Sequence, residues 1–169
     1  MDIRIRHETP ADHAAIYDVT KRAFAPMPYA GGDEQELINR LRDAGALAIS
    51  MVAEVNGRLV GHIAFSPAFA VDGSAGWYAL GPVSAEPELK HRGIGSALIE
   101  AGIAQLKERD AAGCVLIGNP AYYGRFGFLP FPDLAPEGEP AQFFQILPLG
   151  THEPHSVVGF HPLFHSEAS

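Results

Sequence analysis

A basic turn with two closely spaced glycines stands immediately before a long stretch of helical periodicity. It reads Lys90-His91-Arg92-Gly93-Ile94-Gly95-Ser96. The first four amides of a helix lack intrahelical partners, and the helix dipole places partial positive charge at the same end. Gly93 and Gly95 let the backbone approach a ligand closely, while the basic side chains add donors and charge. The turn therefore predicts a phosphate-binding site at a helix N-terminus.

The spacing of these glycines excludes two common phosphate-binding loops. A P-loop ends in Gly-Lys-Ser/Thr, which is missing here, and a dinucleotide fingerprint needs a third glycine where this chain has Leu98. What remains is a basic residue, two intervening residues and Gly-x-Gly, entered from a strand that Gly81-Pro82 interrupts. Proline cannot donate to a sheet ladder, so the interruption predicts an edge, a bulge or a strand that leaves its neighbour.

Hydrophobic periodicity and turn residues predict the elements that position this turn. Strands are expected near residues 3–5, 48–55, 59–65, 77–84, 114–117, 143–147 and 156–160, and helices after Thr9, after Asp33, over 95–110 and, as one turn, over 121–126. Asn56-Gly57 predicts a two-residue hairpin. The strands at 77–84 and 114–117 flank the long helix as a parallel β-α-β unit. The expected fold class is α/β with a mixed sheet, in a single domain over residues 1–169.

Composition limits the partners and the compartment. The formal net charge of −8 argues against a nucleic-acid partner, and an acidic surface either attracts a cationic amine or serves solubility. The single cysteine, Cys114, excludes an intramolecular disulfide and lies in an apolar run, as a buried thiol does. No segment approaches membrane-spanning length, and the N-terminal residues lack an apolar signal core. We therefore expect a cytoplasmic protein without a membrane partner.

Two linked motifs resemble those of the GNAT superfamily of acetyl-CoA-dependent N-acetyltransferases. The first is Leu80-Gly81-Pro82-Val83-Ser84-Ala85 running into the basic turn, and the second is Tyr123-Gly124-Arg125-Phe126-Gly127-Phe128 after the next strand. The order of elements over residues 3–130 is also similar to that superfamily. The resemblance implies a GNAT-like acyl-CoA N-acyltransferase fold. This fold has a central, mostly antiparallel mixed sheet, a parallel strand–helix–strand core, flanking helices, and apolar strands in the tail that complete the sheet.

The same resemblance implies an activity and a set of site residues. An acetyl group would pass from acetyl-CoA, the cosubstrate, to a primary amine by direct attack on the thioester. Cofactor contacts are assigned to Val83, Ser84, Ala85, Lys90, His91, Arg92, Gly93, Ile94, Gly95, Ser96 and Asn119. The superfamily usually has Gln or Arg where this chain has Lys90, which keeps the charge but not the planar fork of arginine. Tyr123 takes the position of the acid that protonates the leaving thiolate, and the adjacent Tyr122 is the alternative.

The base, the acceptor and the oligomeric state stay open. His62 and Glu54 are candidates for the general base, but neither is assigned, because a lone His or Glu on a strand is more often structural. The C-terminal histidines match no compact zinc motif, so no metal site is predicted. We expect residues 24–33 and 130–145 to be the loops that contact the acceptor. Their aromatic residues either shape a pocket or fill the core; they are Phe24, Tyr29, Phe131, Phe143 and Phe144.

The sequence also leaves open the kind of acceptor, the oligomeric state and the class of function. The acceptor is either a small molecule or a peptide, and exposed edge strands leave room for a homodimer. A non-catalytic acyl-CoA-binding or sensing module on the same fold is the main alternative to an enzyme, since fold alone does not imply function. A small acidic protein-interaction domain is a third hypothesis.

Overall fold

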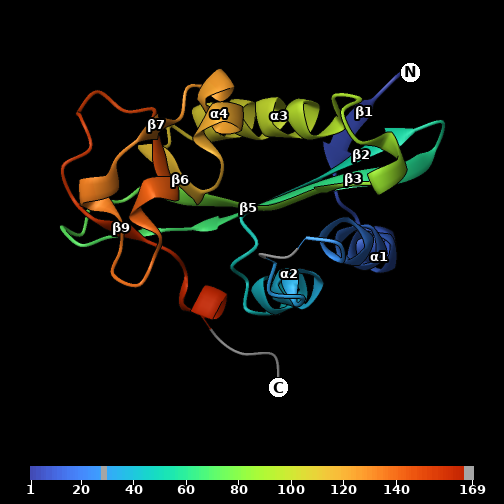
Figure 1. Ribbon diagram of the computed structural model, residues 1–169, viewed down its shortest axis with the longest axis horizontal. Coiled ribbons are helices and arrows are strands. Elements are labelled where there is room, and N and C mark those ends of the chain that lie inside the picture. The colour runs from blue at the N-terminus through green and yellow to red at the C-terminus, as the bar shows by residue number, and fades with distance from the viewer. Residues whose placement is uncertain (28–29, 166–169) are drawn as a thin grey trace.

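A mixed sheet runs through the middle of the molecule, with helices on both of its faces (Figure 1). The computed structural model describes residues 1–27 and 30–165. Within these residues the sheet has seven strands in the order β1-β2-β3-β5-β6-β8-β7. They are β1 (Arg4–His7), β2 (Ile49–Val55), β3 (Arg58–Pro67), β5 (Trp77–Ala85), β6 (Gly113–Ile117), β7 (Leu129–Pro130) and β8 (Phe144–Pro148). Among these described strands, β5 and β6 form the parallel pair and the other pairs are antiparallel, which confirms the predicted sheet.

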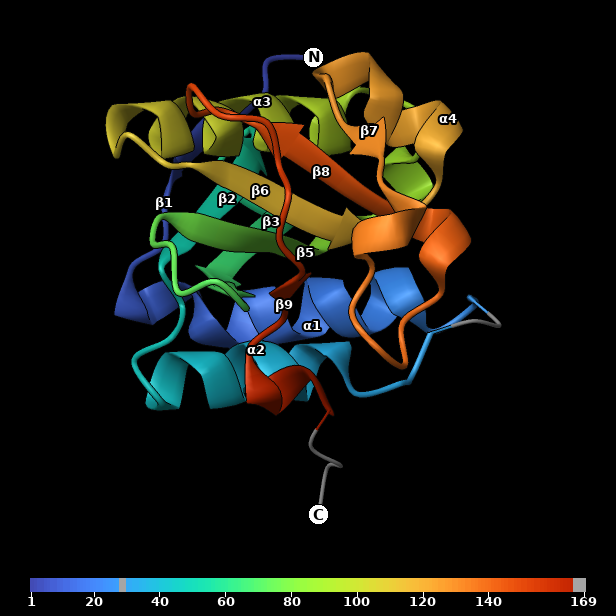
Figure 2. The same cartoon turned by 90° about the vertical axis from the view of Figure 1, so that its left-hand side faces the viewer.

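The helices form one layer on each face of the sheet. α1 (His13–Phe24) and α2 (Glu34–Asp43) cover one face, and α3 (Ile94–Glu108) and the short α4 (Pro120–Tyr123) lie on the other (Figures 1 and 2). All four helical segments were predicted from periodicity and start signals. Asp33 stands at the N-cap of α2, although its carboxylate accepts a hydrogen bond from Arg40 and makes no capping bond.

Asn56 and Gly57 join β2 to β3 in a two-residue turn. Both residues have positive φ, 52° and 77°, as a type I′ turn requires at its two central positions. Val55 pairs directly with Arg58 across the turn. The hairpin predicted from this dipeptide is confirmed, and it sets the register of the long strand β3 against β2.

β5 separates from β6 in the middle of the sheet. Their parallel pairing ends at Ala79. β5 continues along β3 as far as Ala85, with a register shift opposite Gly81-Pro82, while β6 pairs with β8 as far as Ile117. Proline has no amide to give to a ladder, and Pro82 lies at this register shift with β3, three residues after the parallel pairing with β6 ends. The predicted interruption is both a bulge and a strand that leaves its neighbour.

The C-terminal segment differs from the prediction in one respect. β8 and β7 complete the main sheet, as the resemblance implies. The expectation that the last predicted strand also joins this sheet is wrong. β9 (Val158–Gly159) pairs with β4 (Phe69–Ala70) in a separate two-stranded sheet. The physical reason is packing, because the buried Val158 fills an apolar cluster with Phe144 and Ile146 and so draws its strand out of the main sheet.

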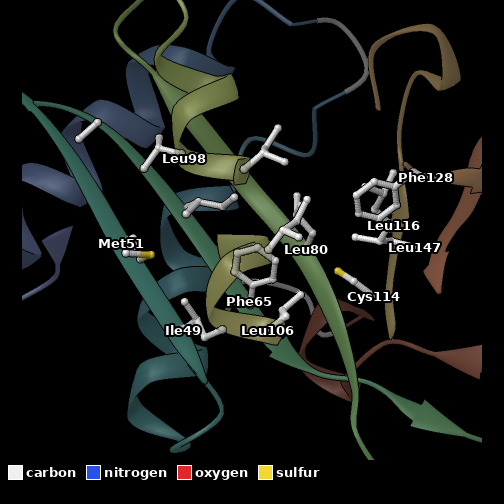
Figure 3. Packing of buried hydrophobic residues seen from close by; sticks show 14 of the residues in the cluster. Ile49, Met51, Phe65, Leu80, Leu98, Leu106, Cys114, Leu116, Phe128 and Leu147 are labelled. Atoms are coloured by element: carbon white, nitrogen blue, oxygen red, sulfur yellow. The ribbon is translucent and has the colours of Figure 1, made fainter. Parts of the chain in front are cut away.

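The largest apolar cluster fills the space between the sheet and α3. Figure 3 shows Phe65, Leu80 and Leu106 gathered in this layer. α3 approaches the sheet closely at Gly102, where an added Cβ would lie 2.2 Å from Cε1 of Phe65. A similar approach occurs at Gly61 of β3, where an added Cβ would lie 2.7 Å from Cγ2 of Ile94. The two glycines therefore let the start and the middle of α3 rest directly against the sheet.

Candidate active site

The basic turn leads into α3 as predicted. Gly93 is the N-cap residue, with a φ of 87° that favours glycine. The amide of Ala97 donates to the Gly93 carbonyl at 3.0 Å, which is the first bond of the helix. The amides from Gly93 to Ser96 therefore precede the intrahelical ladder. The Arg92 amide, in contrast, donates to Leu89 at 3.2 Å inside the turn, so the amides placed to bind an anion begin at Gly93.

The side chains of the turn either anchor it or carry charge. Ile94 is buried and packs in the cluster between α3 and the sheet. Lys90, His91 and Arg92 are exposed. The turn is thus attached to the core through Ile94 and presents cationic or protonatable groups to solvent beside the helix N-terminus, which is the arrangement expected of an anion site.

A tyrosine and an arginine from the segment after β6 lie over the first turn of α3. Nη2 of Arg125 donates to Oγ of Ser96 at 2.8 Å, and its guanidinium lies 4.7 Å from the centroid of the Tyr122 ring. A Cβ added at Gly95 would lie 3.1 Å from the Tyr122 hydroxyl. Glycine at this position therefore makes room for Tyr122. Sequence reasoning missed Arg125, although it stands inside the second motif.

The end of β5 turns two backbone amides away from its sheet partner. The amide of Glu86, just after the strand, donates to the Val60 carbonyl of the β3 hairpin at 2.8 Å. In an antiparallel pair, successive residues alternate between facing the partner strand and facing away from it. Counting back from Glu86, Ser84 faces β3, and Val83 and Ala85 present their amides to the opposite side, which β6 has left. Of the three predicted cofactor-contacting residues, the geometry thus favours Val83 and Ala85.

Glu86 connects this strand end to the basic turn. It is only 4% exposed. Its Oε1 accepts from Nε and Nη2 of Arg22 at 2.9 and 2.7 Å, and its Oε2 accepts from Nη2 of Arg58 at 2.9 Å. Its carbonyl also accepts from the Leu89 amide at 2.9 Å. A buried carboxylate paired in this way is costly to disturb, so it fixes the chain between the two candidate cofactor-binding segments.

Tyr122 and Tyr123 point to different places. The hydroxyl of Tyr122 lies over the α3 turn, whereas the ring of Tyr123 lies against Gly118, where an added Cβ would be 2.5 Å from Cε2. The Tyr123 ring also meets that of Phe128 edge-on at 6.0 Å. Asn119 is the N-cap of α4, and its Oδ1 accepts from the Ala121 amide at 3.0 Å. The predicted single helical turn is therefore confirmed, and Asn119 has a capping role within it.

Ser84 and His62 belong to a buried polar layer on the α1 side of the sheet. Ser84 lies opposite His62 in the β3–β5 register, and its Oγ is 3.5 Å from Oγ1 of Thr20 in α1. Ser50 donates to Glu8, so the 2.8 Å contact between Ser50 Oγ and Nε2 of His62 is donated by His62. His62 is fully buried. Burial lowers its pKa to about 3, and the Glu8 carboxylate offsets only part of this effect.

The other candidates from the sequence do not gather at the turn. Glu54 forms an ion pair with Arg6. Cys114 is buried, and burial raises the pKa of its thiol. Within residues 1–27 and 30–165, no group of three or more His, Cys, Asp and Glu side chains is arranged to hold a metal ion. In the same ranges, no helix is both long enough and apolar enough to cross a membrane.

The aromatic residues near the expected acceptor loops divide between core and surface. Phe144 is buried, and Phe131 packs against the same cluster as Phe144. Phe24 is half-buried, and Phe143 is 44% exposed. Tyr29 lies outside the described residues. Phe144 is therefore a core residue, and Phe143 keeps a surface that an acceptor can contact.

Comparison with known proteins identifies the family. The family model described as Acetyltransferase (GNAT) family matches residues 13–128. The chain belongs to this family. Its fold, its acetyl-CoA cosubstrate and its assignment as an acetyl-CoA-dependent acetyltransferase follow from this membership together with the relatives. The β5–α3 region and the second motif both fall inside the matched range.

Individual relatives cover most of the GNAT chain. The uncharacterized N-acetyltransferase YhbS of Escherichia coli (strain K12) is 31% identical over 125 residues, which are 73% of this chain and 72% of YhbS. A GNAT family acetyltransferase from Brucella melitensis, solved in complex with acetyl-CoA, superposes with a TM-score of 0.85 and 43% identity over 96% of this chain and 98% of its own. E. coli YhbS in complex with CoA superposes with a TM-score of 0.86 and 26% identity over 98% and 93%.

Proposed function

We propose that this acetyltransferase moves the acetyl group of acetyl-CoA to a primary amine by direct attack of the amine on the thioester. The turn from Lys90 to Ser96 holds the pyrophosphate, and Val83 to Ala85 contact the acyl end of the cofactor. One observation carries the proposal. β6 leaves β5 after Ala79, so that the outward amides of Val83 and Ala85 stand on the same chain segment that enters the α3 turn.

The chemistry needs an oxyanion site and an acid. The lone pair of the neutral amine attacks the thioester carbonyl carbon, and the charge that develops on oxygen is stabilised by the amide of Val83 or Ala85. The tetrahedral intermediate collapses, the carbon–sulfur bond breaks, and the thiolate of CoA takes a proton from the Tyr123 hydroxyl. The amine nitrogen loses its proton to water. The phenol O–H of a tyrosine is a proton donor and can serve as this acid.

Tyr123 suits this role better than Tyr122. The Tyr122 hydroxyl lies over Gly95 at the phosphate turn, while Tyr123 lies at Gly118, just after β6. The acid must reach the sulfur, and the sulfur is separated from the pyrophosphate by the whole pantetheine arm. We propose that Asn119 contacts the cofactor through its side-chain nitrogen, since its Oδ1 accepts the capping hydrogen bond of α4.

The acceptor is proposed only as a primary amine, on a small molecule or on a peptide. The formal net charge of −8 supports attraction of cationic amines at long range. A panel of small amines and peptides, incubated with acetyl-CoA, should release CoA in an amine-dependent way, with acetylated acceptor detected by mass spectrometry. Release of CoA without any acetylated amine, or no release over the whole panel, would contradict the proposal.

Tyr123→Phe tests the assigned acid. We expect kcat to fall about a hundredfold or more, because general acid catalysis contributes roughly 10²–10⁴-fold, while the affinity for acetyl-CoA stays near the wild-type value. Tyr122→Phe is the matched control and should leave kcat higher than Tyr123→Phe does. A larger loss of kcat in Tyr122→Phe would reverse the assignment of the two tyrosines.

A further inference from the structure

We propose that Arg125 is a further acetyl-CoA-binding residue and that its guanidinium contacts the pyrophosphate at the N-terminus of α3. Its planar guanidinium would present parallel N–H groups to the phosphate oxygens, which the ammonium of Lys90 does not. The inference rests on the proposed position of the cofactor at this turn. It adds a contact from the segment after α4 to a site otherwise built from β5 and α3.

The contacts of Arg125 place its charge over the first turn of α3. Its Nη2 lies 2.8 Å from Oγ of Ser96, whose amide belongs to the group that precedes the helix ladder. The guanidinium lies 4.7 Å from the centroid of Tyr122 and 5.2 Å from that of Phe126. A side chain that contacts two rings and a hydroxyl loses less rotamer freedom on binding a ligand than a free one does. Its orientation toward the turn is therefore built into the fold.

The pairing of Arg125 also differs from that of several other arginines. Several arginines of the described chain pair with carboxylates; they are Arg6, Arg22, Arg40, Arg42 and Arg58. None of the ion pairs found in residues 1–27 and 30–165 includes Arg125, and its hydrogen-bond acceptor is a neutral hydroxyl. In a chain with a net charge of −8, an arginine that forms no ion pair within the described residues and lies beside a helix N-terminus is available for an external anion.

The chemistry of arginine complements that of Lys90. A guanidinium presents parallel N–H groups that match two phosphate oxygens, whereas a lysine acts as a flexible point charge. The backbone amides from Gly93 to Ser96 approach the anion along the helix axis, and Arg125 approaches it from the α4 side. A diphosphate has enough acceptor oxygens for both. The pyrophosphate is favoured over the 3′-phosphate because Arg125 already bonds to Ser96 of the same turn.

Truncated cofactors test this assignment. Isothermal titration calorimetry would compare wild type and Arg125→Gln with acetyl-CoA, acetyl-dephospho-CoA and acetyl-pantetheine. We expect Arg125→Gln to weaken acetyl-CoA about tenfold, as for loss of one charge-assisted hydrogen-bonded pair. The same fold-change should appear with acetyl-dephospho-CoA, which keeps the pyrophosphate, and should vanish with acetyl-pantetheine, which has none. Arg125→Lys should recover only part of the loss, because it restores charge but not the fork.

Arg109→Gln is the matched control at the other end of α3. Its guanidinium also lies near a tyrosine, 6.0 Å from the Tyr78 centroid, and donates to the Ala48 carbonyl at 2.9 Å. This variant should bind acetyl-CoA like wild type. Equal losses in both variants, or an Arg125 loss that disappears with acetyl-dephospho-CoA, would overturn the inference. Calorimetry needs no acceptor, so a failed amine panel would leave the inference about Arg125 unaffected. Unchanged binding of acetyl-CoA by Gly93→Glu would instead overturn the proposal that the turn from Lys90 to Ser96 holds the pyrophosphate.

Discussion

Replacement of His62 by glutamine should change how the stability of the protein depends on pH. His62 is fully buried, and its imidazole donates to Ser50 at 2.8 Å. Burial lowers its pKa from 6.5 to about 3. The unfolded chain therefore takes up a proton on this histidine at a higher pH than the folded protein does. The stability contributed by the neutral imidazole is complete above pH 6.5 and is lost as the pH falls from there toward 3.

The magnitude follows from the difference between the two pKa values. Between the two pKa values, each pH unit costs about 1.4 kcal/mol of unfolding free energy. On moving from pH about 7.5 to pH about 5, wild type should lose about 2 kcal/mol through His62. Burial raises the pKa of Glu8, but hydrogen bonds from Arg42 and Ser50 lower it overall, and a hydrogen bond from Arg6 lowers the pKa of Asp12. Both carboxylates therefore change stability chiefly below this window. The interval therefore reports mainly on the histidine.

Urea denaturation at the two pH values provides the assay. His62→Gln keeps an N–H donor for Ser50 but cannot titrate, so it should lose about 2 kcal/mol less than wild type between the two conditions, whatever its absolute stability. His152→Gln replaces an exposed histidine, so it serves as the matched control and should follow wild type, since it leaves the buried imidazole of His62 in place. Parallel pH curves for wild type and His62→Gln would refute the reasoning.

Three further predictions concern buried groups. Cys114, whose pKa is raised by burial, should react with Ellman's reagent only as fast as the protein unfolds, and rapid native-state labelling would contradict its burial. Gly102→Ala should lower the unfolding free energy by about 1–3 kcal/mol, measured by urea denaturation, because the new methyl would overlap Phe65. Glu86→Gln should raise KM for acetyl-CoA with little change in kcat. Glu88→Gln, which removes the exposed carboxylate that also pairs with Arg58, should change neither constant. Equal effects of the two variants would argue against a positioning role for Glu86.

The fold was largely predictable because its signals are local. Asn56-Gly57 specifies a turn through backbone sterics alone, and the periodicity of α3 reflects a single apolar face. The interruption at Gly81-Pro82 was also readable, because proline removes a donor wherever it stands. The pairing of β9 with β4 was not predictable, since two-residue strands carry no periodic signal and are positioned by the packing of Val158.

The candidate site was predictable only in part, because several of its contacts join residues on different elements of the fold. The glycines and amides of the basic turn follow from the sequence order of one short segment. The contact of Arg125 with Ser96 joins residues on two different elements, and the close approach of Tyr122 to Gly95 depends on the angle between α4 and α3. The direction of the Val83 and Ala85 amides depends on the register of β5 against β3. The hydrogen bond from the Glu86 amide to the Val60 carbonyl fixes this register, and the sequence alone does not reveal it.

The close packing of α3 against the sheet at Gly61 of β3 and at its own Gly102 has a consequence for redesign of this enzyme. With no side chain at either point, the helix lies in van der Waals contact with the sheet, and larger residues there would push it outward. The turn at the start of α3, which we propose binds the cofactor, is therefore attached to the sheet and cannot move independently of it. We expect the acceptor to bind at the loops that connect α1 to α2 and β7 to β8, so libraries aimed at a new acceptor should vary these loops and leave Gly61 and Gly102 unchanged.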